Sequence, residues 1–93
     1  MTTERRWMVE IFVDEHEDHT RAEARLVVPD ARTSKPAELL RGIGQSRRRG
    51  GELVIQEIED ELAASRALWE LAHTVWTAAV SDLEAVASGS AAR

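Results

Sequence analysis

Two histidines and four carboxylates fall within six residues, Asp14-Glu15-His16-Glu17-Asp18-His19. Imidazole nitrogens and carboxylate oxygens are ligands that borderline and hard cations use. The spacing fits neither the HExxH helix of metalloproteases nor an EF-hand loop, which also needs a central glycine. We interpret the segment as a solvated turn between two strands, and metal binding there stays an open alternative.

Enzymatic chemistry finds little support in the sequence. His16 or His19 could act as a base, but no candidate nucleophile is near either in the sequence. The Gly42-Ile43-Gly44 segment lacks the third glycine and the lysine of a phosphate-binding loop. We therefore expect no enzyme, with no catalytic residue, no metal, no cofactor and no small-molecule substrate.

Arginines form a second group that could do chemistry, because guanidinium groups contact phosphates. Three are consecutive in a turn, and others lie on the expected strands. The candidate contacts for an anion or RNA are Arg21, Arg25, Arg41, Arg47, Arg48 and Arg49.

Composition limits these interpretations. The 93 residues make one small domain, which we expect to be ordered over about residues 5–87 with a flexible tail at 88–93. Residues 1–50 carry ten Lys or Arg against nine Asp or Glu, and residues 51–93 carry two against eight, so +1 and −6 give the net charge of −5. That balance weighs against autonomous tight binding of a nucleic-acid duplex.

We expect a cytoplasmic protein with no membrane contact. The chain has no cysteine, which is compatible with a reducing compartment. The N-terminal MTTERRW lacks the apolar run of a signal peptide, and no segment approaches the roughly 20 apolar residues of a membrane span.

Alternating residue types predict three strands, at residues 7–14, 20–28 and 39–47. The apolar or small side chains on one face of the first two are Trp7, Val9, Ile11, Val13, Ala22, Ala24, Leu26 and Val28. Gly42 and Gly44 share one side of the third strand and indicate close approach of another backbone or side chain. The prolines of the segment 29–38 predict a loop.

One long helix is predicted at residues 55–86, which contain neither glycine nor proline. Steps of three and four residues connect a mostly apolar stripe: Ile55, Ile58, Leu62, Ser65, Trp69, Ala72, Trp76, Ala79, Leu83 and Val86. We interpret this stripe as the core face, with Trp69 or Trp76 against the alanines of the second strand. Arg66, Glu70, His73, Thr77 and Glu84 make the expected wet face.

The length of this helix predicts a homodimer. As one piece it spans roughly 46 Å, against about 27 Å for a strand of eight residues. Either the helix breaks near His73 and Thr74, or its second half packs on another chain. The stripe is wide enough that we favour a second copy. The expected dimer interface consists of Leu71, Val75, Trp76, Ala79, Leu83 and Val86.

Three segments resemble a known family: WMVEIFVDEHEDHTRAEARL, RGIGQSR and QEIEDELAASRALWELAHTVWTAAVSDLEAV. They are similar to small actinobacterial proteins of unknown function that include a dormancy- and hypoxia-induced member. The resemblance implies an α+β fold like that of double-stranded-RNA-binding domains, with three antiparallel strands and one long or kinked C-terminal helix. It also implies homodimers comparable with ribosome hibernation-promoting factors.

The sequence leaves two functions open. The first is a non-enzymatic regulator of stress or dormancy that binds the ribosome or RNA; the role follows from the resemblance, and the six candidate arginines come from this sequence. The second is a protein–protein interaction module with no nucleic-acid contact, in which the helix forms the binding surface.

Overall fold

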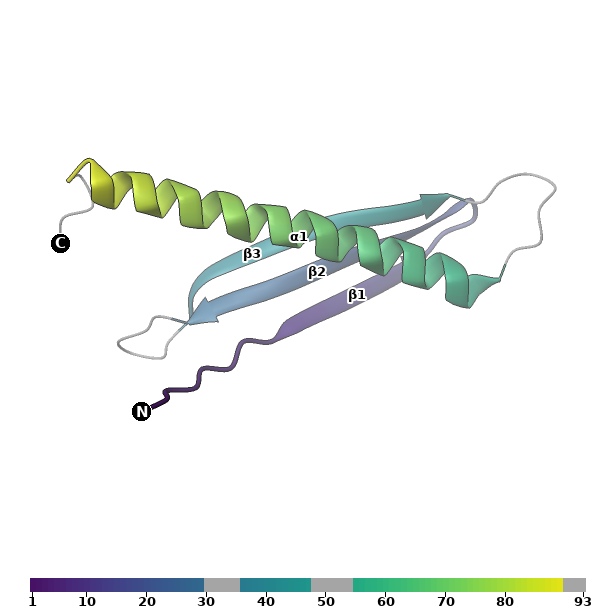
Figure 1. The fold of residues 1–93 in the computed structure, drawn as a ribbon. Coiled ribbons are helices and arrows are strands. Elements are labelled where there is room, and N and C mark those ends of the chain that lie inside the picture. Colours follow the sequence, from purple (N-terminus) through teal and green to yellow (C-terminus); the bar gives the residue numbers. More distant parts are fainter. Residues whose placement is uncertain (30–35, 48–54, 90–93) are drawn as a thin grey trace.

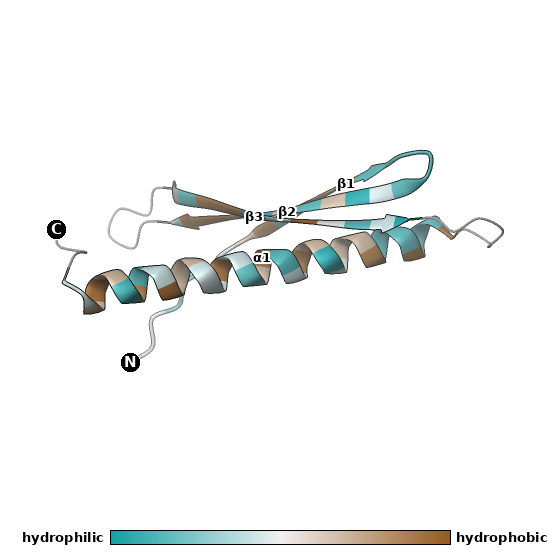
Figure 2. Cartoon of the chain, turned by 90° about the horizontal axis from the view of Figure 1, so that it is seen from above, coloured by the Kyte–Doolittle hydropathy of each residue, from teal (hydrophilic) through white to brown (hydrophobic). Residues whose placement is uncertain are grey.

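The computed structural model describes residues 1–29, 36–47 and 55–89 and shows a two-layer α+β domain (Figure 1). Strands β1 (Val9–Glu15), β2 (His19–Pro29) and β3 (Pro36–Arg47) form an antiparallel sheet in the order β1-β2-β3. Helix α1 (Gln56–Ala87) follows and lies across one face of that sheet (Figure 2). The expected three strands and C-terminal helix are thus confirmed.

The strand register sorts the side chains onto two faces. Ala24 of β2 pairs with Ile11 of β1 and with Gly42 of β3, and this row faces α1. The next row along β2 has Glu23 between Phe12 and Ile43, and it lies on the opposite face. Because side chains alternate along a strand, the middle of the face toward α1 carries small residues, and the open face mixes charged residues with exposed apolar ones such as Phe12 and Ile43.

The two glycines of β3 seat the helix. A Cβ atom on Gly42 would lie 2.8 Å from the carbonyl carbon of Glu70, and one on Gly44 would lie 2.6 Å from the Cβ of Arg66. Backbone atoms of Ala63, Ala67 and Leu71 would be closer still. The close approach predicted from these glycines is confirmed, and the group that approaches is the backbone of α1.

The core consists of small residues from β2 and α1. Its fully or almost fully buried members are Ala22, Ala24, Leu26, Ala63, Ala67 and Leu71, and Val28, Leu40 and Val75 pack against them. Alanine and glycine on both layers let helix and sheet backbones meet closely, so the core is thin, and among the described residues no aromatic side chain belongs to it.

The predicted orientation of the helix is wrong. Trp69 is 82% exposed and Trp76 is 67% exposed, so neither packs on the alanines of β2. A bulky indole has no room where Gly42 and Gly44 already meet the helix backbone. The face bearing Ala63 and Ala67 therefore points inward, and the stripe of larger residues points to solvent.

α1 is continuous through His73 and Thr74, and its last turns extend beyond the end of the sheet (Figure 1). Its 32 residues correspond to about 48 Å. Ile55 provides no side-chain cap, but the first turn is tied to the sheet. Gln56 Nε2 donates to Thr20 Oγ1 at 2.9 Å, and the hydroxyl of Ser46 donates to Glu59.

β1 is less covered than the pattern indicates. Val9, Ile11 and Val13 face the same side as α1, yet they remain 43%, 38% and 41% exposed. The reason is that α1 packs mainly on β2 and β3. Most of the predicted loop 29–38 and the last residues of the tail lie outside the described residues. Within the described residues, no helix combines the length and apolar character needed to cross a lipid bilayer.

Candidate functional site

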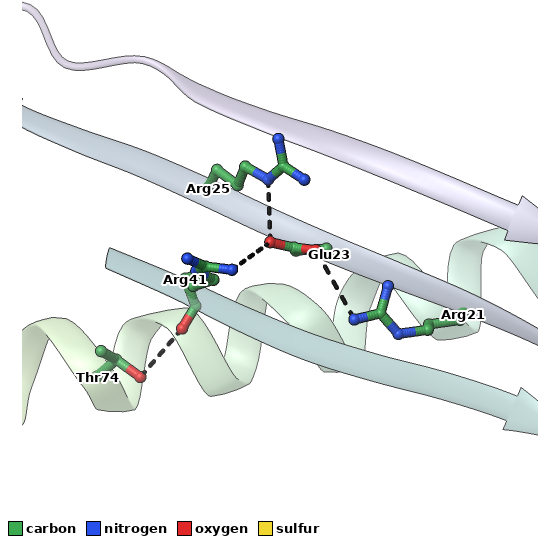
Figure 3. A network of polar contacts seen from close by, with 5 residues as sticks. All are labelled: Arg21, Glu23, Arg25, Arg41 and Thr74. Atoms are coloured by element: carbon green, nitrogen blue, oxygen red, sulfur yellow. Dashed lines mark hydrogen bonds and ion pairs between the residues drawn. The ribbon is translucent and has the colours of Figure 1, made fainter. Parts of the chain in front are cut away.

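Three arginines converge on one carboxylate at the centre of the open sheet face (Figure 3). Glu23 of β2 is 7% exposed and accepts a hydrogen bond from Arg25 Nε at 2.9 Å. Arg41 Nη1 lies 3.5 Å from the same carboxylate, and Arg21 Nη2 lies 3.7 Å from it. Arg21 and Arg25 flank Glu23 at two-residue spacing on β2, and Arg41 comes from β3, opposite Arg25.

The electrostatics of this cluster follow from its geometry. The hydrogen bond from Arg25 is the main cause that holds the pKa of Glu23 below its ordinary value, and the charges of Arg25, Arg41 and Arg21 add to it. The same hydrogen bond raises the pKa of Arg25. Glu10 and Asp14 of β1 stand opposite Arg25 and Arg21, so the described carboxylates of this part of the sheet equal its three arginines in number.

An aromatic ring completes the cluster. The guanidinium carbon of Arg25 lies 4.2 Å from the centroid of Phe12, within the range of a cation–π contact. Phe12 is 42% exposed and stands opposite Glu23 on β1. The contact of Arg25 with Phe12 and its hydrogen bond to Glu23 together hold the guanidinium group between these two side chains.

The structure brings together only part of the predicted arginine set. Arg21, Arg25 and Arg41 share Glu23, whereas Arg47 lies at the far end of β3 and pairs with Asp18 at 3.8 Å. Arg48 and Arg49 lie outside the described residues. The positive charge of the sheet is therefore offset by internal carboxylates.

The turn between β1 and β2 is compact. The His16 amide donates to the His19 carbonyl at 2.8 Å, and the two imidazole rings stack with centroids 4.7 Å apart. His19 Nδ1 donates to Asp18 at 2.8 Å and is the main cause that lowers the pKa of Asp18. Among the described residues, no group of three or more His, Cys, Asp or Glu side chains is arranged to hold a metal ion.

The outer face of α1 is the second candidate surface. We call the side chains at three- and four-residue steps along it the outer stripe: Ile55, Ile58, Leu62, Ser65, Trp69, Ala72, Trp76, Ala79, Leu83 and Val86. Its large apolar members are 39–82% exposed, and they lie on the side of α1 opposite Ala63 and Ala67. A row of large apolar side chains in water is unusual for a monomer.

Of the predicted dimer interface, Trp76, Ala79, Leu83 and Val86 belong to this outer stripe. Leu71 does not, because it is 4% exposed and packs in the core over Gly42. Val75 is partly buried against the core. The interface prediction is therefore wrong for Leu71.

Glu23 was missing from the predicted site. Its signal was the local pattern Arg21-Ala22-Glu23-Ala24-Arg25, which puts two cations beside one anion on the same strand face. The part played by Arg41 depends on the register of β2 with β3, which the sequence alone does not give.

Comparison with known proteins identifies relatives over most of the chain. Residues 5–92 match the family model described as Rv2632c-like. An uncharacterized protein of Mycobacterium bovis, Mb1767, is 39% identical over 80 residues, which cover 86% of this chain and 78% of that protein. The uncharacterized protein Rv2632c of Mycobacterium tuberculosis is 34% identical over 77 residues, which cover 83% and 75%. The crystal structure of Rv2632c superposes with a TM-score of 0.75 at 29% identity, covering 91% of this chain and 93% of that one.

Proposed function

The chain belongs to the Rv2632c-like family, and we propose that it is a non-enzymatic interaction module that binds protein through the outer stripe of α1. The observation that carries this proposal is the orientation of the helix. The small side chains Ala63 and Ala67 hold the fold together, while Trp69 and Trp76 face solvent. Tryptophan is enriched among residues that dominate binding energy at protein interfaces.

The spacing of the outer stripe points to a helical partner. Its ten positions alternate steps of three and four, which is the 3.5-residue repeat of a coiled-coil seam. The opposite side of α1 packs on the sheet, where Ala63, Ala67 and Leu71 are buried. A second helix laid along the seam would cover both tryptophans without disturbing the fold.

A second copy of this chain is the first partner that the seam fits. Every other position is large at Leu62, Trp69, Trp76 and Leu83, and the positions between them include the small Ser65, Ala72 and Ala79. Two antiparallel copies can set each tryptophan against a small residue of the partner. Parallel copies would put tryptophan on tryptophan and alanine on alanine, which packs less evenly. We therefore propose an antiparallel, two-fold homodimer.

Light scattering over a dilution series tests this. The wild type should run at about twice the chain mass of 10.4 kDa at micromolar concentration. Trp76→Asp should give a folded monomer, because its side chain is 67% exposed and the change buries a charge only in the dimer. Trp7→Asp is the matched control, since Trp7 is 50% exposed and lies outside the helix. A compact wild-type monomer at every concentration would refute the homodimer.

The protein-binding proposal can be tested apart from self-association. Trp76→Asp should lose the protein partners that the wild type captures from a nuclease-treated lysate, and Trp7→Asp should keep them. If both variants capture the same partners, the outer stripe binds no protein other than a second copy of this chain.

A second candidate function rests on the three arginines that converge on Glu23. In it the protein is a stress- and dormancy-associated regulator in the cytoplasm that contacts the ribosome or RNA through Arg21, Arg25 and Arg41. The family resemblance supports this role, and the cluster supplies cations and an exposed ring, Phe12, on one face.

Co-sedimentation with purified ribosomes at low and high salt tests the second candidate. A bound fraction that falls with salt is expected if arginines contact phosphates. Arg41→Ala should reduce it, and Arg5→Ala, in the exposed N-terminal segment, is the control. The absence of any bound fraction at low salt would refute the candidate.

A further inference from the structure

The two edges of the sheet are covered to different degrees. α1 lies over β3, where Arg66 donates to the carbonyl of Gln45 and Thr74 to that of Arg41. β1 and β3 are the two edge strands, and each has a paired strand on one side only. In the described part of the chain, no backbone hydrogen bond outside the β-ladder involves residues 9–14. β1 is thus the less covered of the two edges, the kind of edge to which another strand can add.

The side chains of β1 also lack cover. On the side of α1, Val9, Ile11 and Val13 are 38–43% exposed, although their partners on β2 are almost fully buried. On the open face, Glu10 stands opposite Arg25, and Asp14 stands opposite Arg21. The N-terminal segment leads away from β1 and does not run along it (Figure 1). An added strand would extend both the apolar row and the charged row.

From this placement we infer that β1 is a docking edge for an extended segment of another protein that alternates apolar and basic residues. Side chains of the docked strand on the α1 side would pack on Val9, Ile11 and Val13. Those on the open face would meet Glu10 and Asp14, which lie four residues apart. Each carboxylate would then have guanidinium groups on both sides, as Glu23 already has between its arginines. Opposite charges directly across strands stabilise the pairing of the strands.

Charge selects this partner over a second copy of β1. The strand Val9–Glu15 carries three carboxylates and no cation. Two copies paired edge to edge would bring six carboxylates together, and like charges across strands destabilise pairing. The main-chain hydrogen bonds of an added strand give affinity, while the alternation of side chains gives specificity. This inference does not depend on the outer stripe, which lies on the far side of α1.

A labelled, capped peptide, Thr-Val-Arg-Val-Thr-Val-Arg-Val-Thr, is the probe. It should bind the protein in fluorescence anisotropy, and it should slow hydrogen exchange of β1 amides but not of β3 amides. The same peptide with glutamate in place of arginine should bind at least about tenfold more weakly. Exchanging both carboxylates, with Glu10→Lys and Asp14→Lys, should reverse this preference.

Two single variants locate the site. Ile11→Lys places a charge between Val9 and Val13, and it should lower the affinity for the arginine peptide by about tenfold or more. Ile43→Lys makes the same change at a similarly exposed isoleucine of β3, 46% against 38%, and should keep binding. Trp76→Asp should also keep binding, which separates this result from a failure of the proposed helix interface.

Several results would overturn the inference. Equal affinity for the two peptides would show that charge does not select the partner. An equal loss of peptide affinity in Ile11→Lys and Ile43→Lys would show that the peptide does not bind specifically at β1. Slow exchange of β1 amides before any peptide is added, lost on dilution, would show that a second copy already occupies the edge.

Discussion

Gly42→Ala should destabilise the fold strongly although it adds one methyl group. In an ordinary strand, replacing glycine by alanine stabilises, because glycine loses more conformational freedom on folding. Here the new Cβ would lie 2.8 Å from the Glu70 carbonyl carbon and closer to two further backbone atoms of α1. Ordinary van der Waals contact for a Cβ begins at about 3.4 Å, so the helix must move away.

The magnitude follows from what must move. The obstructing atoms belong to helix backbone, which cannot rotate aside as a flexible side chain can. Adding a methyl group to a tightly packed core costs about 1–3 kcal/mol and occasionally more. A shift of α1 away from the sheet also separates Ala63 and Ala67 from Ala22 and Ala24. We therefore expect Gly42→Ala to lower the free energy of unfolding by about 3 kcal/mol. That is a large share of the roughly 5–15 kcal/mol that hold a domain folded.

Urea denaturation followed by far-ultraviolet circular dichroism measures this, with all proteins at one concentration. Ile43→Ala is the control, because Ile43 lies between the two glycines but on the other face and is 46% exposed. It should cost under about 1 kcal/mol. Gly44→Ala should destabilise the fold by about as much as Gly42→Ala. The double variant should lose less stability than the two single variants added together, since one movement of α1 relieves both contacts. A midpoint for Gly42→Ala at or above that of the wild type would refute the seating of α1 on these glycines.

Three further changes test other parts of the structure. Trp69→Ala should lower the free energy of unfolding by under about 1 kcal/mol, because Trp69 is 82% exposed. This is measured in the Trp76→Asp background, so that dimers do not contribute. A loss above about 3 kcal/mol would contradict this orientation of α1. The pKa of Glu23 in the folded state is below its ordinary value of 4.5. The wild type should therefore be more stable than Glu23→Gln by a constant amount above that pH, and this difference should shrink as the pH falls. A difference that grows in acid would contradict the arginine contacts of Glu23. Arg47→Ser should leave the thermal midpoint nearly unchanged, because Arg47 and Asp18 are 71% and 72% exposed, and a large drop would give Arg47 a structural role.

Periodicity predicted the elements well. The helix expected at 55–86 is Gln56–Ala87, and the three expected strands are present with shifted ends. These elements follow from local alternation of side chains, which the sequence displays directly. The solvent exposure of Arg66, Glu70 and His73 was also predicted correctly.

The packing face of α1 was not predictable from hydrophobicity. The pattern assigns the inner face to the largest apolar residues, and here that stripe contains Trp69 and Trp76. In the structure the small residues of α1 face the sheet instead, because Gly42, Gly44 and the alanines of β2 leave no space for an indole. A search for matching small residues on both layers would have selected Ala63 and Ala67. The sequence places Arg21 and Arg25 beside Glu23 on one strand. The third partner, Arg41, could be identified only from the register of β2 with β3.

The division of α1 into an inner and an outer side has a consequence for how this family can diversify. Substitutions at inner positions such as Ala67 act on folding, whereas substitutions at Trp69 or Leu83 change the surface and leave the core intact. Selection can therefore act on partner choice and on stability through separate sets of positions along one helix. Divergence among relatives should be concentrated on the outward positions, with the glycines and inward alanines kept, so that one scaffold serves different partners.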